Sequence, residues 1–175
     1  NTNYCGIVIE YDTVKPLQHS KRINIGSYKG SGNVHIGFIG AGSYAMNHLI
    51  PNVKTNKHAI LKGVMTSKGS SSRSVAERYS FEFCTSEEEE IIESKCINTI
   101  FIATRHNSHA YYTIKALKAG KNVFVEKPLC LNEHQLAEIT KIMDTSAQVA
   151  EQPCLMVGFN RRFSLLTQKL KQEIG

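Results

Sequence analysis

Short apolar runs alternate along most of the chain with segments in which apolar residues recur every three or four positions. The runs are short, rich in β-branched residues and bounded by glycine or polar turns, which predicts strands over 34–39, 60–65, 81–83, 97–103, 122–125 and 155–159. The other segments predict helices over 44–53, 72–79, 109–119, 132–148 and 164–174. Such alternation predicts an α/β fold, a three-layer, doubly wound parallel sheet.

Local end signals support several of these helices. Gly120 follows the helix over 109–119 as a C-terminal stop, and Asn132 with Gln135 resembles a capping box. Pro51 is expected to interrupt the helix that begins near residue 44. Ser86 with Glu89 predicts a further capping box. The acidic run 87–90 is therefore interpreted as a helix start, where the helix dipole favours it, and not as a metal or acid/base site.

Residues 1–33 differ from the rest of the chain. Strand character is found at 4–11 and again at 22–25, and 26–32 has the composition of a flexible linker. We expect two parts: a strand-containing segment over 1–33, which would be the end of a preceding domain, and a nucleotide-binding domain over 34–175. A leader without fixed structure is the alternative for the first part.

The first predicted strand ends in the pattern G-x-G-x-x-A. Gly40 would permit a tight turn, Gly42 would let the backbone approach a pyrophosphate, and Ala45 would let the next helix pack closely on the strand. The helix start would then offer free N–H groups to the phosphates. This pattern predicts a dinucleotide-binding Rossmann unit, with the turn residues Gly40, Ala41, Gly42, Ser43 and Tyr44 as cofactor contacts. A tight turn without a ligand is the alternative.

The end of the second strand bears on the choice of cofactor. An acidic residue about 20 positions after the glycines would hold the ribose 2′-hydroxyl of NAD, yet none occurs before Glu77. Hydroxyl and basic side chains stand there instead, and they could accept a 2′-phosphate: Thr66, Ser67, Lys68 and Arg73. The stretch favours NADP over NAD, although its hydroxyls also suit NAD. The missing carboxylate weakens an S-adenosylmethionine site.

Polar residues also follow the later strands, at the sheet edge where such folds bind ligands. His106 and His109 lie three positions apart, but no third metal ligand accompanies them, so no metal site is predicted. Glu126 and Lys127 end the next strand, where a lysine beside a cofactor could act as an acid or base. A surface ion pair is the alternative. Arg161 and Arg162, a pair after the last strand, could bind an anion or form salt bridges.

Composition narrows the function classes. The net charge is +6 and the only dense charge run is acidic, so nucleic-acid binding is not favoured. Five widely spaced cysteines without a C-x-x-C pair indicate reduced thiols in a cytoplasmic protein. No apolar run approaches the length of a transmembrane helix, and no membrane partner is expected.

Together these motifs resemble the Gfo/Idh/MocA family of NAD(P)-dependent oxidoreductases. The resemblance covers about residues 34–165 and is carried, in the family's order, by Gly40-Ala41-Gly42, Ile102-Ala103-Thr104 with His109-Ala110, Glu126-Lys127-Pro128 and Gly158-Phe159-Asn160-Arg161-Arg162-Phe163. The variant Ala103-Thr104-Arg105-His106 departs from the commoner Ala-Thr-Pro-Asn form. It is similar to members in which this module follows a zinc-type alcohol-dehydrogenase-like domain.

The resemblance implies a dehydrogenase or reductase acting on a sugar, cyclitol or sugar nucleotide, with Lys127 as the catalytic residue and Glu126 positioning it. It also implies that the nicotinamide side is lined by Ala103, Thr104, Arg105, His106 and His109, with Arg162 nearby. Family members continue into an α+β substrate domain, so we expect this chain to be a fragment that binds cofactor and is inactive alone. A non-catalytic dinucleotide-binding module for sensing or assembly is the alternative.

Overall fold

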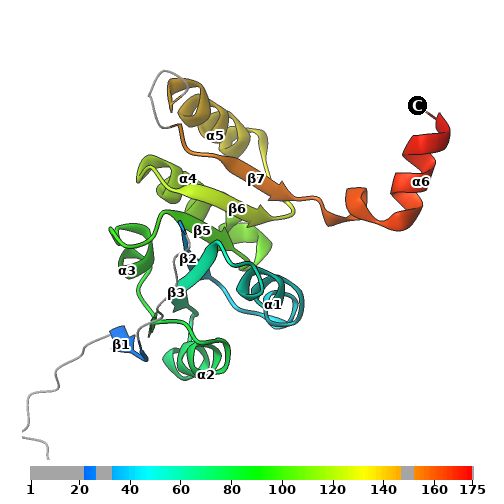
Figure 1. Cartoon of the computed structure of the whole chain (residues 1–175). Coiled ribbons are helices and arrows are strands. Elements are labelled where there is room, and N and C mark those ends of the chain that lie inside the picture. Colours follow the sequence, from blue (N-terminus) through cyan, green and yellow to red (C-terminus); the bar gives the residue numbers. More distant parts are fainter. Residues whose placement is uncertain (1–21, 27–32, 147–151, 175) are drawn as a thin grey trace, which may run out of the picture.

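A seven-stranded sheet forms the centre of the molecule in the computed structural model, which describes residues 22–26, 33–146 and 152–174 (Figure 1). The strand order is β1-β4-β3-β2-β5-β6-β7, and only β1 is antiparallel to its neighbour. This confirms the predicted α/β fold. The strands are β1 (Arg22–Asn24), β2 (Val34–Ile39), β3 (Ala59–Met65), β4 (Phe83–Thr85), β5 (Thr99–Ile102), β6 (Asn122–Glu126) and β7 (Leu155–Gly158).

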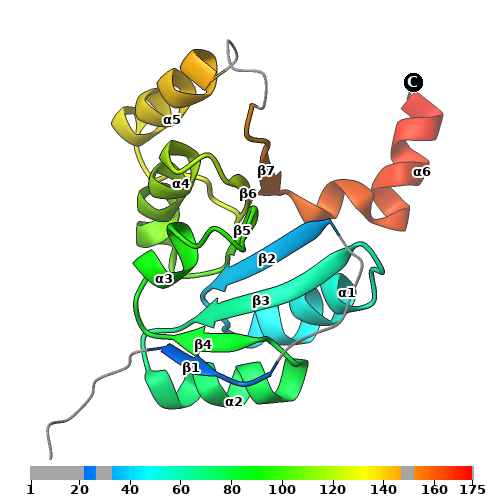
Figure 2. The same cartoon turned by 60° about the vertical axis from the view of Figure 1, so that its left-hand side comes forward.

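Helices cover the sheet on two sides. One face carries α3 (Glu89–Ile92), α4 (His109–Lys118) and α5 (Glu133–Ser146), and the other carries α1 (Ile50–Lys54) and α2 (Gly69–Tyr79) (Figure 2). The last helix, α6 (Leu165–Ile174), projects away from the sheet. Shorter helical turns precede α1, α4 and α6: η1 (Ala45–Leu49), η2 (His106–Ser108) and η3 (Asn160–Phe163).

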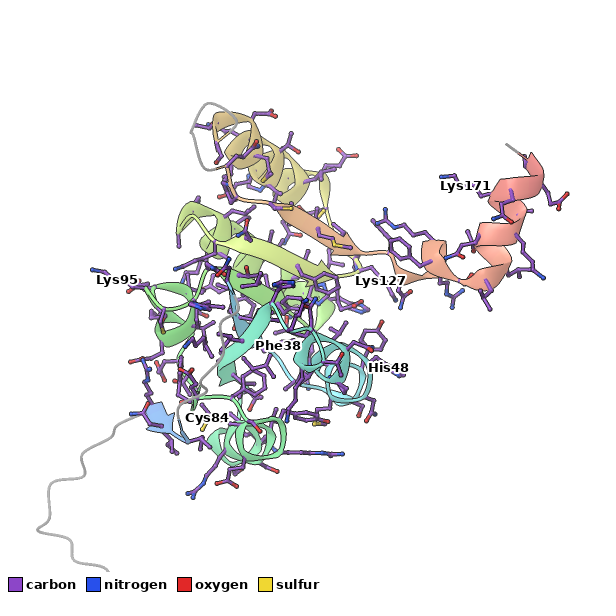
Figure 3. All side chains as sticks on the ribbon, viewed as in Figure 1. Phe38, His48, Cys84, Lys95, Lys127 and Lys171 are labelled. Carbon is purple, nitrogen blue, oxygen red and sulfur yellow. The ribbon has the colours of Figure 1, made fainter. Side chains whose placement is uncertain are left out.

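Alternating side chains of the strands build a core on each face, because successive residues of a strand point to opposite sides. In β2, Phe38 packs with α1 and α2, and the next residue, Ile39, packs with α3 and α4. Figure 3 shows Phe38 inside the molecule, and it is fully buried. Gly63 lets α3 and β4 come close, since a Cβ there would lie 2.7 Å from Ile91 Cδ1 and 2.4 Å from Phe83 Cζ.

Several local predictions are confirmed. The strand expected at 22–25 is β1, and Gly120 ends α4 with a positive φ of 69°. Asn132 caps α5, since its Oδ1 accepts a hydrogen bond of 2.9 Å from the backbone N–H of Gln135. The strand predicted over 4–11 and the last residues of the helix predicted to 148 lie outside the described residues.

Other local predictions are wrong. Ser86 does not cap α3, which begins at Glu89 without a side-chain cap. The Ser86 hydroxyl contacts the Glu87 carboxylate instead. Pro51 does not interrupt its helix: η1 has wide π turns, and α1 follows directly with Pro51 in its first turn, where no N–H is needed. The strand predicted over 81–83 lies two residues later, at β4.

Candidate functional site

Two adjoining cavities lie where the parallel strands end. One has a volume of about 660 Å³ and borders the ends of β2, β3 and β5, and the other, of about 350 Å³, borders β2, β5, β6 and β7. Gly42, Ala103 and Thr104 line both cavities, so the glycine turn stands between them. The arrangement is an elongated site with two compartments, called here the β3 compartment and the β6 compartment.

The glycine turn after β2 has the geometry that its sequence predicts. Gly40 has a positive φ of 88°, and a Cβ there would lie 2.6 Å from the carbonyl oxygen of Ala103. Its N–H donates a hydrogen bond of 2.8 Å to Met65 O, which ties the turn to the end of β3. At Gly42 a Cβ would meet no protein atom within 4 Å. The space beside Gly42 is thus left free by the protein itself, on the side where both cavities open.

Hydroxyl and basic groups line the β3 compartment. Thr66 donates its hydroxyl hydrogen to Lys68 O at 2.8 Å, which shapes the turn into α2. Ser67, Lys68 and Ser71 line the same wall. Arg73, one turn further along α2, lies outside the cavity and donates to Glu77 Oε1 at 2.8 Å.

The loop after β5 forms the wall between the compartments. The Thr104 and Ser108 hydroxyls lie 2.7 Å apart, and Ser108 donates to Arg105 O at 2.9 Å. These bonds order the short η2 turn before α4. His106 is exposed, and its ring lies 5.6 Å from the ring of His109.

His109 joins two of the loops that build the site. Its ring is almost completely buried, with 1% of the residue exposed. Nδ1 lies 2.7 Å from Pro128 O, and Nε2 lies 3.1 Å from Thr104 O. Whichever nitrogen carries the proton, the acceptor is a carbonyl oxygen, one after β5 and the other after β6. The histidine therefore holds the loop that follows Lys127 against the loop that carries Thr104.

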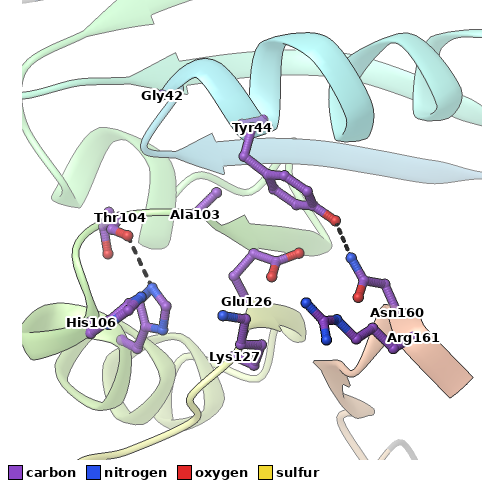
Figure 4. A pocket seen from close by; sticks show the side chains of 11 residues that line it. Gly42, Tyr44, Ala103, Thr104, His106, Glu126, Lys127, Asn160 and Arg161 are labelled. Carbon is purple, nitrogen blue, oxygen red and sulfur yellow. Dashed lines mark hydrogen bonds between the residues drawn. The ribbon is translucent and has the colours of Figure 1, made fainter.

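Glu126 and Lys127 project into the β6 compartment (Figure 4). Glu126 Oε1 is buried and has no hydrogen-bond partner among the described residues. Burial raises the pKa of this carboxyl group, while the backbone N–H of Lys127 acts in the opposite direction. Gly158 makes room for it, since a Cβ there would lie 2.9 Å from Glu126 Oε1. A buried acceptor without a donor is costly, and it suits a ligand that brings a hydroxyl or amide hydrogen.

The segment after β7 closes the far side of the β6 compartment. Asn160 donates a hydrogen bond of 2.7 Å to the Tyr44 hydroxyl, which links this segment to the helix that follows the glycine turn (Figure 4). Arg161 lines the cavity. Arg162 points elsewhere: its Nε donates to Phe159 O at 3.1 Å, and its guanidinium lies 5.5 Å from the Phe159 and Phe163 rings.

The structure brings most of the predicted site residues together. Those that line one or both compartments are Gly40, Ala41, Gly42, Tyr44, Thr66, Ser67, Lys68, Ala103, Thr104, Arg105, His106, His109, Glu126 and Lys127. Ser43, Arg73 and Arg162 line neither. Arg161, one of the predicted pair of arginines, lines the β6 compartment. Lining residues that were not predicted are Met65, Ser71, Asn107, Ser108 and Tyr112 in the β3 compartment, and Ala45 and Asn160 in the β6 compartment.

In the described part of the chain, no group of three or more His, Cys, Asp or Glu residues could hold a metal ion. Among the helices found there, none is long and apolar enough to cross a membrane.

A model of the oxidoreductase family with an NAD-binding Rossmann fold matches residues 34–159, which is well over half of the chain. The chain belongs to the Gfo/Idh/MocA family. The match begins at β2 and ends directly after β7, so it contains the glycine turn, the loop after β5 and the Glu126–Lys127 segment. Membership thus rests on the part of the chain that builds both compartments.

Curated relatives in this family include inositol dehydrogenases. The chain is 30% identical over 141 residues to the myo-inositol 2-dehydrogenase of Thermotoga maritima, which covers 81% of this chain and 40% of that protein. It is 33% identical over 101 residues to the NAD⁺-dependent scyllo-inositol 2-dehydrogenase of Bacillus subtilis, covering 57% of this chain and 28% of that one. The chain therefore spans less than half the length of these relatives.

Solved structures show the same fold. A putative myo-inositol dehydrogenase from Sinorhizobium meliloti is 26% identical, with a TM-score of 0.69 over 81% of this chain and 40% of that chain. A 3-ketoreductase from Actinomadura kijaniata, solved with NADP and TDP-benzene, has a TM-score of 0.72 at 18% identity, over 81% of this chain and 43% of that one. At this identity the second likeness concerns the fold alone.

Proposed function

We propose that this Gfo/Idh/MocA chain is the cofactor-binding domain of an NAD(P)-dependent dehydrogenase or reductase. The substrate class that we propose is a sugar, cyclitol or sugar nucleotide with a hydroxyl or keto carbon. The names of the inositol dehydrogenases support the cyclitol part of this class.

The observation that carries the proposal is the pair of compartments that meet at Gly42. A nicotinamide dinucleotide has two nucleoside halves joined by a pyrophosphate, and the open backbone at Gly42 suits the pyrophosphate. The hydroxyls and Lys68 of the β3 compartment suit an adenosine ribose. The unpaired Glu126 Oε1 in the β6 compartment suits a donor from the nicotinamide half. The residues present therefore fit this cofactor.

The chemistry then divides between the cofactor and the protein. A nicotinamide dinucleotide accepts or donates a hydride, which no side chain can do. Lys127 would bind the reacting oxygen of the substrate and give or take its proton at Nζ. Glu126 would fix the lysine in place, and the His109 bridge between the two loops would limit its movement.

The β3 compartment favours NADP over NAD in this proposal. Lys68 lines the cavity without an acidic residue beside it, and Ser67 and Ser71 supply hydroxyl groups. A ribose 2′-phosphate would gain a charge-assisted hydrogen bond there, whereas NAD would use only the hydroxyls. Arg73 remains a predicted contact only, since it is bonded to Glu77 outside the cavity.

Calorimetric titration with NADPH, NADH and S-adenosylmethionine at one ionic strength tests the binding part of the proposal. We expect both nicotinamide cofactors to bind and NADPH to bind more tightly. Tighter binding of NADH would agree with the proposed reaction class and contradict the proposed preference for NADP over NAD. Binding of S-adenosylmethionine alone would contradict the whole proposal.

The alternative is a non-catalytic dinucleotide-binding module, and Lys127→Ala in the full-length protein separates it from an enzyme. An enzyme is expected to lose most of its turnover, about 100-fold or more, as general acid–base groups usually contribute. Its cofactor affinity is expected to change little. Unchanged turnover would remove Lys127 from the proposed role.

A further inference from the structure

The segment after β5 sends neighbouring side chains into different compartments. Arg105 lines the β3 compartment and not the β6 compartment, whereas the next residue, His106, lines the β6 compartment and not the β3 compartment (Figure 4). Ser108 and Tyr112 also line the β3 compartment, and His109 lines the other. Residues three or four positions apart share one face of a helical segment. The helical period of η2 and α4 thus separates residues 105 and 106.

The backbone of Arg105 is held in place by its own chain. Its carbonyl oxygen accepts two hydrogen bonds from Ser108, one of 3.0 Å from the backbone N–H and one of 2.9 Å from the hydroxyl. The carbonyl oxygen of the preceding residue, Thr104, lies 3.1 Å from Nε2 of the buried His109. An anchored backbone loses little freedom when its side chain binds a ligand, so this position suits recognition.

Tyr112 provides a second planar side chain on the same wall. Its ring is half-buried, packs against the core beneath α4 and lies 5.1 Å from the ring of Tyr111. The Glu88 carboxylate, which accepts a hydrogen bond of 2.6 Å from the Tyr111 hydroxyl, is also close to Tyr112. Burial and this carboxylate together raise the pKa of Tyr112. These contacts give the Tyr112 ring a fixed place on the wall.

The two walls of the β3 compartment differ in chemistry. The wall after β3 offers hydroxyl groups and the Lys68 ammonium, which suit a ribose and its phosphate. The wall after β5 offers the guanidinium of Arg105 and the phenol ring of Tyr112, and both groups are planar. Such groups stack on nucleobases, whereas a ribose has no flat face. A nucleoside therefore fits in one orientation, with its sugar toward β3 and its base toward β5.

We propose that Arg105 binds the adenine base of the nicotinamide dinucleotide by stacking its guanidinium on the ring, with Tyr112 beside it. This inference rests on the proposed function, since it places a dinucleotide in the two compartments. It differs from what the family resemblance implies for Arg105, which is a place beside the nicotinamide. His106 keeps that place, because it lines the compartment that contains Glu126 and Lys127. Residues 105 and 106 would then contact opposite halves of one cofactor.

Stacking on adenine has a consequence for the choice of cofactor. The base is the same in NAD and NADP, so Arg105 would strengthen the binding of both without distinguishing them. The distinction would stay with Lys68 on the opposite wall, where a ribose 2′-phosphate would lie. The two basic residues of the compartment would therefore have separate roles, one in affinity and one in selectivity.

Calorimetric titration of the full-length protein with ADP-ribose and NADH tests the assignment. ADP-ribose carries the adenine base and lacks both the nicotinamide and the 2′-phosphate. We expect Arg105→Ala to weaken the binding of both ligands by the same factor, about tenfold, as the loss of one stacking partner does. His106→Ala is the matched control at the neighbouring position, and it is expected to leave ADP-ribose binding unchanged.

Two further variants separate stacking from attraction to phosphate. Arg105→Tyr keeps a planar side chain and removes the charge, while Arg105→Lys keeps the charge and removes the plane. We expect Arg105→Tyr to restore the ADP-ribose affinity to within about threefold of the wild type, and Arg105→Lys to restore less. Recovery with lysine alone would make Arg105 a pyrophosphate contact and overturn the inference. Arg105 is exposed, and circular dichroism verifies that each variant is folded.

The outcomes also separate this inference from the proposed function. If the wild type binds both ligands and Arg105→Ala binds ADP-ribose equally well, only the assignment of Arg105 is overturned. A loss of affinity for NADH without a loss for ADP-ribose would place Arg105 beside the nicotinamide, which overturns it as well. If the wild type binds neither ADP-ribose nor any nicotinamide cofactor, the proposed function fails and the inference fails with it.

Discussion

The two compartments of the candidate site are built very differently. In the β6 compartment, His109 ties two loops together from a buried position, and Tyr44 is bonded to Asn160 across the cavity. In the β3 compartment, the side chains at the turn after β3 are hydroxyls and one free-standing lysine near solvent. This difference fits the proposed function, in which the β6 compartment would hold the reacting groups in place and the β3 compartment would bind a ribose.

His109→Phe is expected to have the largest effect, because it removes the ring that links two loops of the β6 compartment. The variant removes both ring contacts, and whichever carbonyl oxygen accepts the ring N–H, that of Thr104 or that of Pro128, loses its donor. We expect the free energy of unfolding to fall by about 2–4 kcal/mol, measured by urea denaturation. His106→Phe is the matched control, since His106 is exposed, and a change within about 0.5 kcal/mol is expected there. Equal losses of unfolding free energy in the two variants would contradict a stabilising role of the His109 contacts.

Lys68→Glu acts on the β3 compartment and is expected to change binding more than stability. We expect the affinity for NADPH to fall about tenfold or more, because a charge-assisted hydrogen bond is replaced by repulsion. The affinity for NADH is expected to change little. Arg73→Glu is the control, since that side chain lies outside the cavity. A larger effect of Arg73→Glu in calorimetry would mean that α2 turns Arg73 toward the cofactor.

Glu126→Gln is expected to have the smallest effect. Unlike the other variants, it is expected to raise a measured quantity, the melting temperature at pH 7. Burial raises the pKa of Glu126 above its ordinary value of 4.5, so folding favours the protonated form. The carboxyl group then makes its best contribution to stability at low pH, and that contribution is lost as the pH rises through the folded pKa. The variant should match the wild type near pH 4 and melt at a higher temperature at pH 7. A lower melting temperature at pH 7 would indicate a stabilising partner for the carboxylate.

Periodicity and turn chemistry predicted most of the fold, since each strand of the parallel part carries its own apolar run. The capping box at Ser86 failed for a tertiary reason. The neighbouring Glu88 carboxylate accepts hydrogen bonds from Tyr111 and Lys115 of α4. Burial alone would raise the pKa of Glu88, but these bonds outweigh it and lower the pKa. No local pattern around Ser86 contains that information.

The sequence predicted at which strand ends the site lies. It did not predict which residues of each turn face the cavity. Ser71 lines the β3 compartment and Arg73 does not, because two positions along a helix differ by more than half a turn. In the same way, η3 directs Arg161 to the cavity and Arg162 to the aromatic rings beside it. Residue type pointed to an arginine in this segment, but only the backbone decides which arginine faces the cavity.

The antiparallel strand β1 has a consequence for the behaviour of the protein in solution. Without it, β4 would be the edge of the sheet, and its free backbone groups could pair with a strand of another molecule. β1 is only three residues long, and its Arg22 lies 3.8 Å from the centre of the Phe83 ring and 3.3 Å from Glu90. A short, charged strand is a poor template for further pairing. β1 therefore protects this side of the sheet against aggregation.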